Sequence, residues 1–203
     1  MAIGGRPALR HGRHGFEGLA ATITGQQVST ASAAAIFGRL SLAVRPLTPE
    51  VFLGAGDATL RACGLSRAKV RTLRTVAEAA LNGALPVDEF GAMPPDEARR
   101  RLVALKGIGP WTADVFLLFC LGEPDAFPAG DLALQEAHRL VFGGGARPGA
   151  AALESLVERW RPWRGVGAYL LWACYRNLRG GRATPVPDGA LTAAPPRDEN
   201  TGR

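Results

Sequence analysis

Apolar residues recur at three- and four-residue spacing along most of the chain, which is the pattern of amphipathic helices. Ser29 can cap a run that extends to Val44, and Thr48 precedes a short run that begins with Pro49. A third run starts at Asp57 and ends at Gly64. Ser66 precedes a helix that ends before Gly83 and carries one apolar face: Val70, Leu73, Val76, Ala77 and Ala80. The two-residue alternation typical of strands does not occur in the sequence, so we expect an all-α fold.

Further helices are expected in the second half of the chain. Pro95 suits a first helical position, and an apolar stripe with Leu102 and Leu105 continues until Gly107 stops the helix. Pro110 can begin the next helix, over about residues 110–121, and Asp131 opens the amphipathic run LALQEAHRLVF. Beyond a glycine-rich break at 143–145, the pattern predicts helices over residues 150–160 and 165–178.

Composition divides the chain into a central domain and two flanking segments. Its 203 residues, 47% of them hydrophobic, are enough to bury one sizeable core or two closely packed lobes. We expect this domain over residues 16–178. Residues 1–15 form a basic N-terminal arm, and residues 179–203 are proline-rich and polar, which is typical of a disordered tail.

A turn with two glycines joins two of the expected helices. In Gly107-Ile108-Gly109-Pro110, two residues without a Cβ surround one apolar residue, and the proline begins the next helix. Unpaired backbone N–H groups at the positive end of that helix would offer a phosphate site, with Lys106 adding a charge. A tight helix corner, in which the glycines serve only close packing, would give the same pattern.

Asp131 follows the segment Phe127-Pro128-Ala129-Gly130, which cannot continue a helix. Its structural role would be to cap the next helix. A carboxylate at a helix N-terminus is also oriented and kept ionised by the helix dipole. Capping and catalysis are therefore compatible at this residue.

The net charge of +6 favours a polyanionic partner. Only Lys69 and Lys106 are lysines, so arginine, which binds phosphate through a planar fork, makes up the rest of the 24 basic residues. A codon bias toward arginine and alanine would give the same composition, so charge supports a nucleic-acid partner without deciding it.

Cysteine and histidine do not indicate a metal site. Cys63, Cys120 and Cys174 lie far apart within apolar helical patterns, which is typical of small buried side chains. The three histidines have no ligand spacing with one another or with cysteine: His11, His14 and His138. No apolar run has membrane-spanning length and residues 1–15 lack the apolar core of a secretory signal, so we expect a cytoplasmic protein without a membrane partner.

Four motifs in order resemble the helix-hairpin-helix base-excision DNA glycosylase superfamily, and within it the 3-methyladenine DNA glycosylase II branch. They are Phe16-Glu17-Gly18-Leu19 through Ile23-Thr24-Gly25-Gln26-Gln27-Val28-Ser29, then Leu105-Lys106-Gly107-Ile108-Gly109-Pro110-Trp111-Thr112-Ala113, then Phe127-Pro128-Ala129-Gly130-Asp131, and Trp160-Arg161-Pro162-Trp163-Arg164 with Trp172. The resemblance covers roughly residues 16–178. It implies a two-lobed helical fold with the active site in the cleft between the lobes.

The resemblance implies that Asp131 is the catalytic aspartate. Cleavage of an N-glycosidic bond leaves positive charge on the deoxyribose, and an ionised carboxylate would stabilise that charge or position the attacking water. In members that also cut the DNA strand, the place of Trp111 holds a lysine that forms a Schiff base. Because Trp111 is no amine nucleophile, we expect a monofunctional enzyme that leaves an abasic site.

The same resemblance assigns the remaining site residues. Trp111 and Trp172 match aromatic positions of the base pocket, where stacking and cation–π attraction favour a cationic alkylated purine; ordinary core is the alternative for Trp172. Val115 and Leu132 stand where some relatives place aromatic pocket residues. Gln27 matches the wedge that fills the gap left by the flipped nucleotide, or it lies in a polar loop before the Ser29 cap. The other expected DNA contacts are Gln26, Ser29, Lys106, Gly107, Ile108, Gly109 and Thr112.

Two further expectations concern Arg164 and the tryptophans Trp160 and Trp163. We interpret Trp160 and Trp163 mainly as packing residues. Arg164 would pair with a buried carboxylate or with the loop before Asp131.

No cofactor is expected to be required. Some members of the superfamily carry an iron–sulfur cluster on four closely spaced cysteines after the aspartate helix, and this sequence has no such set, so no cluster is expected. Backbone carbonyls of Val103, Leu105 and Gly107 match a family site for a monovalent cation at the hairpin. The expected partner is duplex DNA with damaged bases, bound by a monomer.

The sequence thus predicts a glycosylase that flips and excises alkylated purines. A glycosylase for deaminated or oxidised bases remains an alternative within the same family. A non-catalytic DNA-binding helix-hairpin-helix module is a second alternative, but it would need neither a placed carboxylate nor an aromatic pocket. A helical protein-interaction domain would explain neither the basic charge nor the glycine turn.

Overall fold

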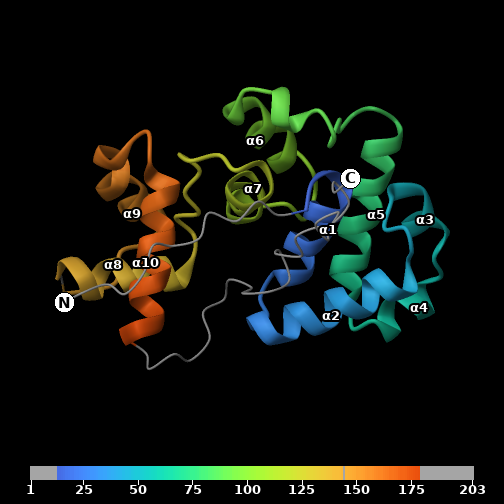
Figure 1. The fold of residues 1–203 in the computed structure, drawn as a ribbon, viewed down its shortest axis with the longest axis horizontal. Coiled ribbons are helices and arrows are strands. Elements are labelled where there is room, and N and C mark those ends of the chain that lie inside the picture. The colour runs from blue at the N-terminus through green and yellow to red at the C-terminus, as the bar shows by residue number, and fades with distance from the viewer. Residues whose placement is uncertain (1–12, 144, 179–203) are drawn as a thin grey trace, which may run out of the picture.

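A computed structural model describes residues 13–143 and 145–178, and these residues are helical, with no strand among them (Figure 1). The all-α prediction is confirmed. The expected arm before residue 13 and the expected tail from residue 179 lie outside the described residues. The elements are α1 (Gly15–Gly25), α2 (Thr30–Ala43), α3 (Pro49–Gly54), α4 (Asp57–Ala62), α5 (Arg67–Leu81), the 3₁₀ turn η1 (Phe90–Ala92), α6 (Pro95–Val103), α7 (Pro110–Phe116), the π-helical η2 (Leu117–Leu121), α8 (Leu132–Phe142), α9 (Ala150–Val157), the 3₁₀ turn η3 (Glu158–Trp160) and α10 (Arg164–Leu178).

The helices form two lobes joined near α7 (Figure 1). In the first lobe α1 packs against α2, α5 and α7, and α5 also packs against α3 and α4. In the second lobe α8 packs against α10 and α9. The chain passes from one lobe to the other in the segment between η2 and α8, directly before Asp131.

Polar caps explain where several helices begin. The hydroxyls of Ser29, Thr48 and Ser66 accept hydrogen bonds from backbone N–H groups in the first turns of α2, α3 and α5. These three helix starts agree with the sequence pattern. The helix that begins at Asp57 ends at Ala62, two residues before the expected Gly64.

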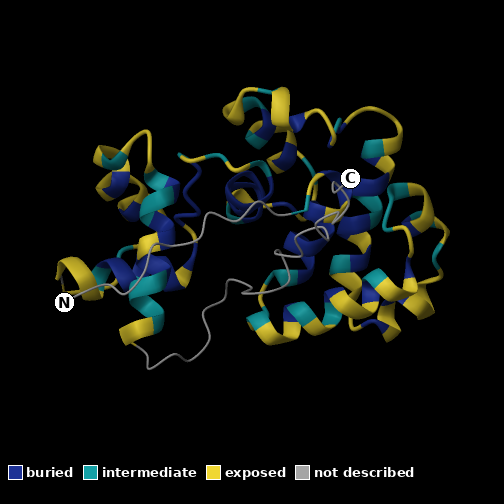
Figure 2. Ribbon diagram, in the orientation of Figure 1, coloured by how far each residue is buried: buried dark blue, intermediate teal, exposed yellow. Residues whose placement is uncertain are grey.

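Helix α1 was not predicted from periodicity, because it is buried on nearly all sides. Within it only Glu17 and Gly25 are not buried. A helix surrounded by protein has no polar face, so its sequence lacks the apolar stripe that marks an amphipathic helix. Figure 2 shows the dark, buried character of α1 and α7 where the first lobe faces the rest of the molecule.

The hairpin between α6 and α7 differs in detail from the prediction. Helix α6 ends at Val103 rather than at Gly107, and tighter bonds follow, from Leu105 N to Leu102 O and from Ile108 N to Leu105 O. Gly107 then adopts a φ of +94°, which a side chain would disfavour. Helix α7 begins at Pro110 as expected and continues into the π-helical turn η2, which ends before Gly122.

The second lobe contains an aromatic cluster around Trp160. Its ring contacts those of Phe127, His138 and Phe142 at centroid distances of 5.8–6.3 Å, so its predicted packing role is confirmed. Trp163 was also interpreted as a packing residue, and that prediction was wrong: it is 59% exposed. It lies in the turn between η3 and α10, where its side chain lines an open apolar groove instead of entering the core.

Candidate active site

Asp131 lies at the junction of the two lobes, as the residue that caps α8. Its Oδ1 accepts hydrogen bonds from Ala133 N at 2.9 Å and Leu134 N at 3.1 Å, which confirms the predicted cap. Only 3% of the residue is exposed. Burial of a carboxylate is costly unless hydrogen-bond donors satisfy it, and the helix N-terminus supplies two of them.

Two indole groups supply the other donors to Asp131. Trp111, at the start of α7, donates from Nε1 to Oδ2 at 3.0 Å. Trp172, on α10, donates from Nε1 to Oδ1 at 3.3 Å. Three elements that are far apart in the sequence therefore meet at one carboxylate, and both predicted pocket tryptophans belong to that meeting point.

A cleft of about 610 Å³ opens beside Asp131. It is bounded by the turn between α1 and α2, by the hairpin with the first turn of α7, and by the start of α8: Gln26, Gln27, Gly107, Trp111, Thr112, Gly130, Asp131 and Leu132. None of these described lining residues carries an amine. The cleft therefore presents one carboxylate and one indole to a ligand, and no nucleophile of the Schiff-base type.

The predicted pocket residues are divided between cleft and core. Trp111 and Leu132 line the cleft, and Leu132 is 60% exposed. Val115 is buried on α7, with 4% of the residue exposed, and it is not among the residues that line the cleft. Trp172 is 4% exposed and stacks on Phe119, so it reaches the site through its N–H and not through its ring face.

Gln26 connects the turn between α1 and α2 with the hairpin. Its Nε2 donates to Gly107 O at 3.2 Å and to Thr112 Oγ1 at 2.9 Å. The neighbouring Gln27 is exposed and has a φ of +55°, the one positive φ of a non-glycine residue in the described chain. Because a side chain disfavours this conformation, the bonds of Gln26 help to hold Gln27 in it.

Other predicted DNA contacts surround the same turn and hairpin. Ser29 is exposed at the cap of α2, and Lys106 and Gly109 are exposed on the hairpin, whereas Ile108 is buried beneath it. Lys69, which sequence reasoning did not assign to the site, donates from Nζ to Thr24 O at 2.8 Å behind the turn. Burial lowers the pKa of Lys69, as expected for a lysine drawn into the protein.

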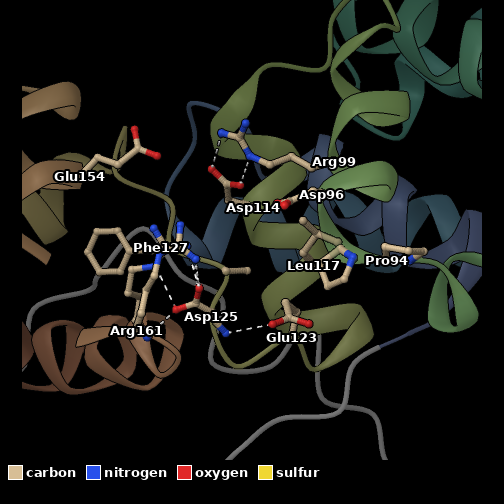
Figure 3. Close-up of a pocket in the computed structure, with 13 residues that line it drawn as sticks. Pro94, Asp96, Arg99, Asp114, Leu117, Glu123, Asp125, Phe127, Glu154 and Arg161 are labelled. Atoms are coloured by element: carbon tan, nitrogen blue, oxygen red, sulfur yellow. Dashed lines mark hydrogen bonds and ion pairs between the residues drawn. The ribbon is translucent and has the colours of Figure 1, made fainter. Parts of the chain in front are cut away.

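An ion-pair cluster anchors the segment that leads to Asp131 (Figure 3). Arg164 donates from Nε to Oδ1 of Asp125 at 2.9 Å and from Nη2 to Oδ2 at 2.8 Å, and Arg161 Nη1 lies 2.5 Å from Oδ2. Burial opposes ionisation of Asp125, but the hydrogen bonds and charges of the two arginines lower its pKa overall. The expected pairing of Arg164 with the loop before Asp131 is confirmed.

A second ion pair joins the two helices of the hairpin (Figure 3). Arg99 of α6 donates to the carboxylate of Asp114 on α7, with Nε 2.6 Å from Oδ1. Burial raises the pKa of Asp114, and the hydrogen bond from Arg99 works against that rise. Sequence reasoning missed this pair, whose role is to hold α6 against α7 and so fix the hairpin between them.

Three backbone carbonyls predicted as cation ligands lie at the end of α6 and in the hairpin. Gly107 O accepts from Gln26 and Leu105 O accepts from Ile108 N, and each carbonyl oxygen has a second lone pair. The negative end of the α6 dipole suits a cation there, so these groups fit the expected site. Among the described residues, no cluster of three histidine, cysteine or acidic side chains is arranged as a metal site.

No cysteine is among the described residues that line the cleft beside Asp131. Cys63 and Cys120 are buried free thiols, and burial raises the pKa of Cys120 to about 12, so it is not a nucleophile at neutral pH. Within the described residues, no helix combines the length and apolar character needed to cross a membrane.

Comparison with known proteins identifies the family of this fold. Residues 20–162 match the HhH-GPD superfamily of base excision DNA repair proteins, a range that contains the hairpin, Gln26 and Asp131. The chain belongs to this superfamily. Of the described groups that donate to Asp131, Trp172 alone lies outside the range that matches the HhH-GPD superfamily.

Two relatives and one solved structure from Schizosaccharomyces pombe are similar to most of this chain. The chain is 30% identical over 172 residues to the alkylbase DNA glycosidase-like protein mag2 of Schizosaccharomyces pombe, covering 82% of this chain and 81% of mag2. It is 32% identical over 161 residues to DNA-3-methyladenine glycosylase 1 of the same yeast, covering 77% and 71%. The solved structure of the yeast 3-methyladenine DNA glycosylase Mag1 in complex with abasic DNA superposes with a TM-score of 0.75, at 29% identity, over 84% of this chain and 85% of Mag1.

Proposed function

We propose that this protein is a monofunctional DNA glycosylase that flips alkylated purines of the 3-methyladenine type out of duplex DNA and hydrolyses their N-glycosidic bonds. The observation that carries the proposal is the buried carboxylate of Asp131, which borders the cleft between the lobes. The activities in the names of mag2, DNA-3-methyladenine glycosylase 1 and Mag1 support the substrate class.

In the proposed reaction, Asp131 stabilises charge that develops on the sugar. The bond between C1′ and the base nitrogen breaks, and its electron pair neutralises the positive charge of the alkylated base. The sugar becomes oxocarbenium-like, and the nearby carboxylate stabilises that charge. Water then bonds to C1′ and releases a proton, which leaves an abasic site.

The cleft favours a base that is already cationic. Trp111 provides an electron-rich ring at the wall of the cleft, which attracts a positively charged purine by stacking and cation–π interaction. Asp131 is the only ionisable side chain among the described lining residues, so the cleft offers no acid to protonate a neutral leaving base. A base that departs without protonation suits such a site.

The rest of the cleft would grip the DNA. Gln27 would fill the gap left by the flipped nucleotide, with Gln26 and Ser29 beside it. The hairpin would bind phosphate through its backbone N–H groups and Lys106, with Gly107, Ile108, Gly109 and Thr112 shaping that contact. Carbonyls of Val103, Leu105 and Gly107 would hold a monovalent cation, which would supply positive charge for a DNA phosphate; no other cofactor is proposed.

Release of free base from methylated duplex DNA tests the proposal. Wild-type protein should release 3-methyladenine, and Asp131→Asn should reduce the single-turnover rate by at least about 100-fold, the scale of a lost electrostatic contribution to a transition state. Asp57→Asn, a substitution of the same kind on exposed α4, is the control and should retain the wild-type rate. Full activity of Asp131→Asn would refute the catalytic assignment.

Strand cleavage tests the monofunctional part of the proposal. After base release, the DNA should remain intact until it is heated or treated with alkali. Nicking without such treatment, or trapping of a protein–DNA adduct by borohydride, would contradict it, because both require an amine that attacks the sugar.

We also propose that the protein acts as a monomer in the cytoplasm, at the nucleoid if its source is a bacterium. Its proposed substrate is genomic duplex DNA, and the cleft is built from one chain. Light scattering during size-exclusion chromatography, with and without a lesion-containing duplex, should give one protein chain for each duplex. A dimer on a single lesion would refute this assembly.

A further inference from the structure

The two oxygens of Asp131 are held in different ways. Oδ1 accepts three hydrogen bonds, from Ala133 N, Leu134 N and Trp172 Nε1. Oδ2 accepts one, from Trp111 Nε1. A carboxylate oxygen has two in-plane lone-pair directions, so Oδ1 is saturated and Oδ2 retains the capacity for a new contact.

The two indoles also differ in their surroundings. Trp172 is buried in the second lobe, where its ring stacks on Phe119 at 5.5 Å and meets Tyr169 edge-on. Its N–H direction is therefore fixed by packing. Trp111 is partly exposed in the first turn of α7 and lines the cleft, so its N–H reaches Oδ2 from the side of the ligand.

We propose that Trp111 and Trp172 are positioning residues, which act through their indole N–H groups to hold the carboxylate of Asp131 in one orientation with Oδ2 available to the reacting sugar. Trp172 fixes Oδ1 from the core of the second lobe, and Trp111 fixes Oδ2 from the hairpin of the first. The inference rests on the proposed catalytic function of Asp131. This role depends on the indole N–H groups and differs from stacking of the aromatic rings on the flipped base.

The arrangement links the orientation of the carboxylate to the position of the two lobes. The donors to Oδ1 all come from the second lobe, whereas the donor to Oδ2 comes from the first. Thr112, the neighbour of Trp111, is bonded to Gln26. The hairpin that would receive a DNA phosphate thus also carries the group that orients Asp131.

Phenylalanine substitutions separate the N–H group from the aromatic ring. Trp111→Phe and Trp172→Phe keep a ring and remove the donor, and Trp163→Phe makes the same change at an exposed tryptophan outside the cleft. Each protein is measured for the single-turnover rate of 3-methyladenine release from duplex DNA, for substrate concentration at half-maximal rate, and for affinity toward abasic-site DNA.

The donor variants should be slow but should bind normally. We expect each to lose about tenfold in the maximal rate, the scale of one hydrogen bond to a charged group, with little change in affinity for abasic-site DNA. Trp163→Phe should match wild type in every measurement.

Two outcomes would overturn the inference and leave the proposed function intact. One is a wild-type maximal rate in both donor variants while Asp131→Asn is inactive. The other is a rise in the substrate concentration at half-maximal rate with an unchanged maximal rate, which indicates that Trp111 only stacks on the base. If Asp131→Asn itself retained full activity, the proposed function would fail instead. Thermal melting checks folding, and Trp111→Phe, at a partly exposed site, decides the question if Trp172→Phe does not fold.

Discussion

Arg164 holds Asp125 in a two-point contact, with Nε 2.9 Å from Oδ1 and Nη2 2.8 Å from Oδ2. The backbone N–H of Arg164 also donates to Oδ1 at 3.2 Å. The contact ties the start of α10 to the segment six residues before Asp131. Both the capping aspartate and the indole of Trp172 depend on elements that this pair joins, so the pair positions the site without touching the cleft.

Asp125→Ala should lower both stability and the rate of base release. The free energy of unfolding should fall by about 2 kcal/mol, because the largely buried Arg164 and the exposed Arg161 lose their charged acceptor. Urea denaturation measures this change, and Glu97→Ala, which removes a salt-bridge partner of exposed arginines on α6, should cost well under half as much. Equal losses for the two variants would argue against an anchoring role of Asp125.

The ion pair between Asp125 and Arg164 predicts that the stability of the fold depends on pH. The pKa of Asp125 is lowered in the folded protein, so the folded state binds its proton less readily than the unfolded chain does. The contribution of ionised Asp125 to the free energy of unfolding is complete above the pKa of the unfolded chain, about 3.9. It is lost as the pH falls through the lower pKa of the folded state. Wild type and Asp125→Asn should therefore converge in unfolding free energy below about pH 4. A constant difference down to the acid transition would contradict the assignment.

Gly107→Ala should destabilise the hairpin, whereas Gly109→Ala should not. Gly107 has a φ of +94°, and a Cβ there would overlap Thr72 Oγ1 on α5. Left-handed backbone and overpacking each cost about 1–2 kcal/mol, so a loss of about 2–4 kcal/mol is expected in urea denaturation. Gly109 has no heavy atom within 4 Å of its ideal Cβ position and has a negative φ. A similar loss in both variants would show that glycine is needed only for general flexibility.

Gln27→Gly should stabilise the protein while slowing base release. Glycine relieves the strain of a φ of +55°, which is worth up to about 1 kcal/mol, but it removes the side chain proposed as the wedge. Gln27→Ala is the matched comparison, because it removes the same side chain and keeps the strain. Both variants should release base slowly, and only the glycine variant should melt at a higher temperature. Wild-type rates in both would exclude the wedge.

Much of the fold could be predicted from the sequence because its helix boundaries are marked by local chemistry. Ser29, Thr48, Ser66 and Asp131 each cap the helix expected of them, since a side-chain oxygen and the N–H groups it accepts from are neighbours in sequence. Helix α1 lacks such a cap and is buried on nearly all sides, so neither signal was available.

The sequence identified most residues of the candidate site, but it did not specify how they are arranged. Asp131, Trp111 and Gln26 meet at one cleft as expected, but the N–H bond of Trp172 spans 41 residues and has no local pattern. Val115 resembles a pocket position in sequence but lies in the core, because which residues of α7 are buried depends on tertiary packing and not on sequence spacing. The Arg99–Asp114 pair likewise follows from how α6 and α7 cross, which spacing alone does not specify.

The single amide nitrogen of Gln26 joins the proposed wedge to the proposed phosphate clamp. Because this nitrogen donates to both Gly107 O and Thr112 Oγ1, the distance between Gln27 and the hairpin is fixed by the protein. In a straight duplex and in a kinked one, the base stack and the neighbouring phosphate lie at different distances from each other. For the proposed reaction, the DNA must supply the deformation, so a lesion that loosens base stacking is easier to fit than an intact pair.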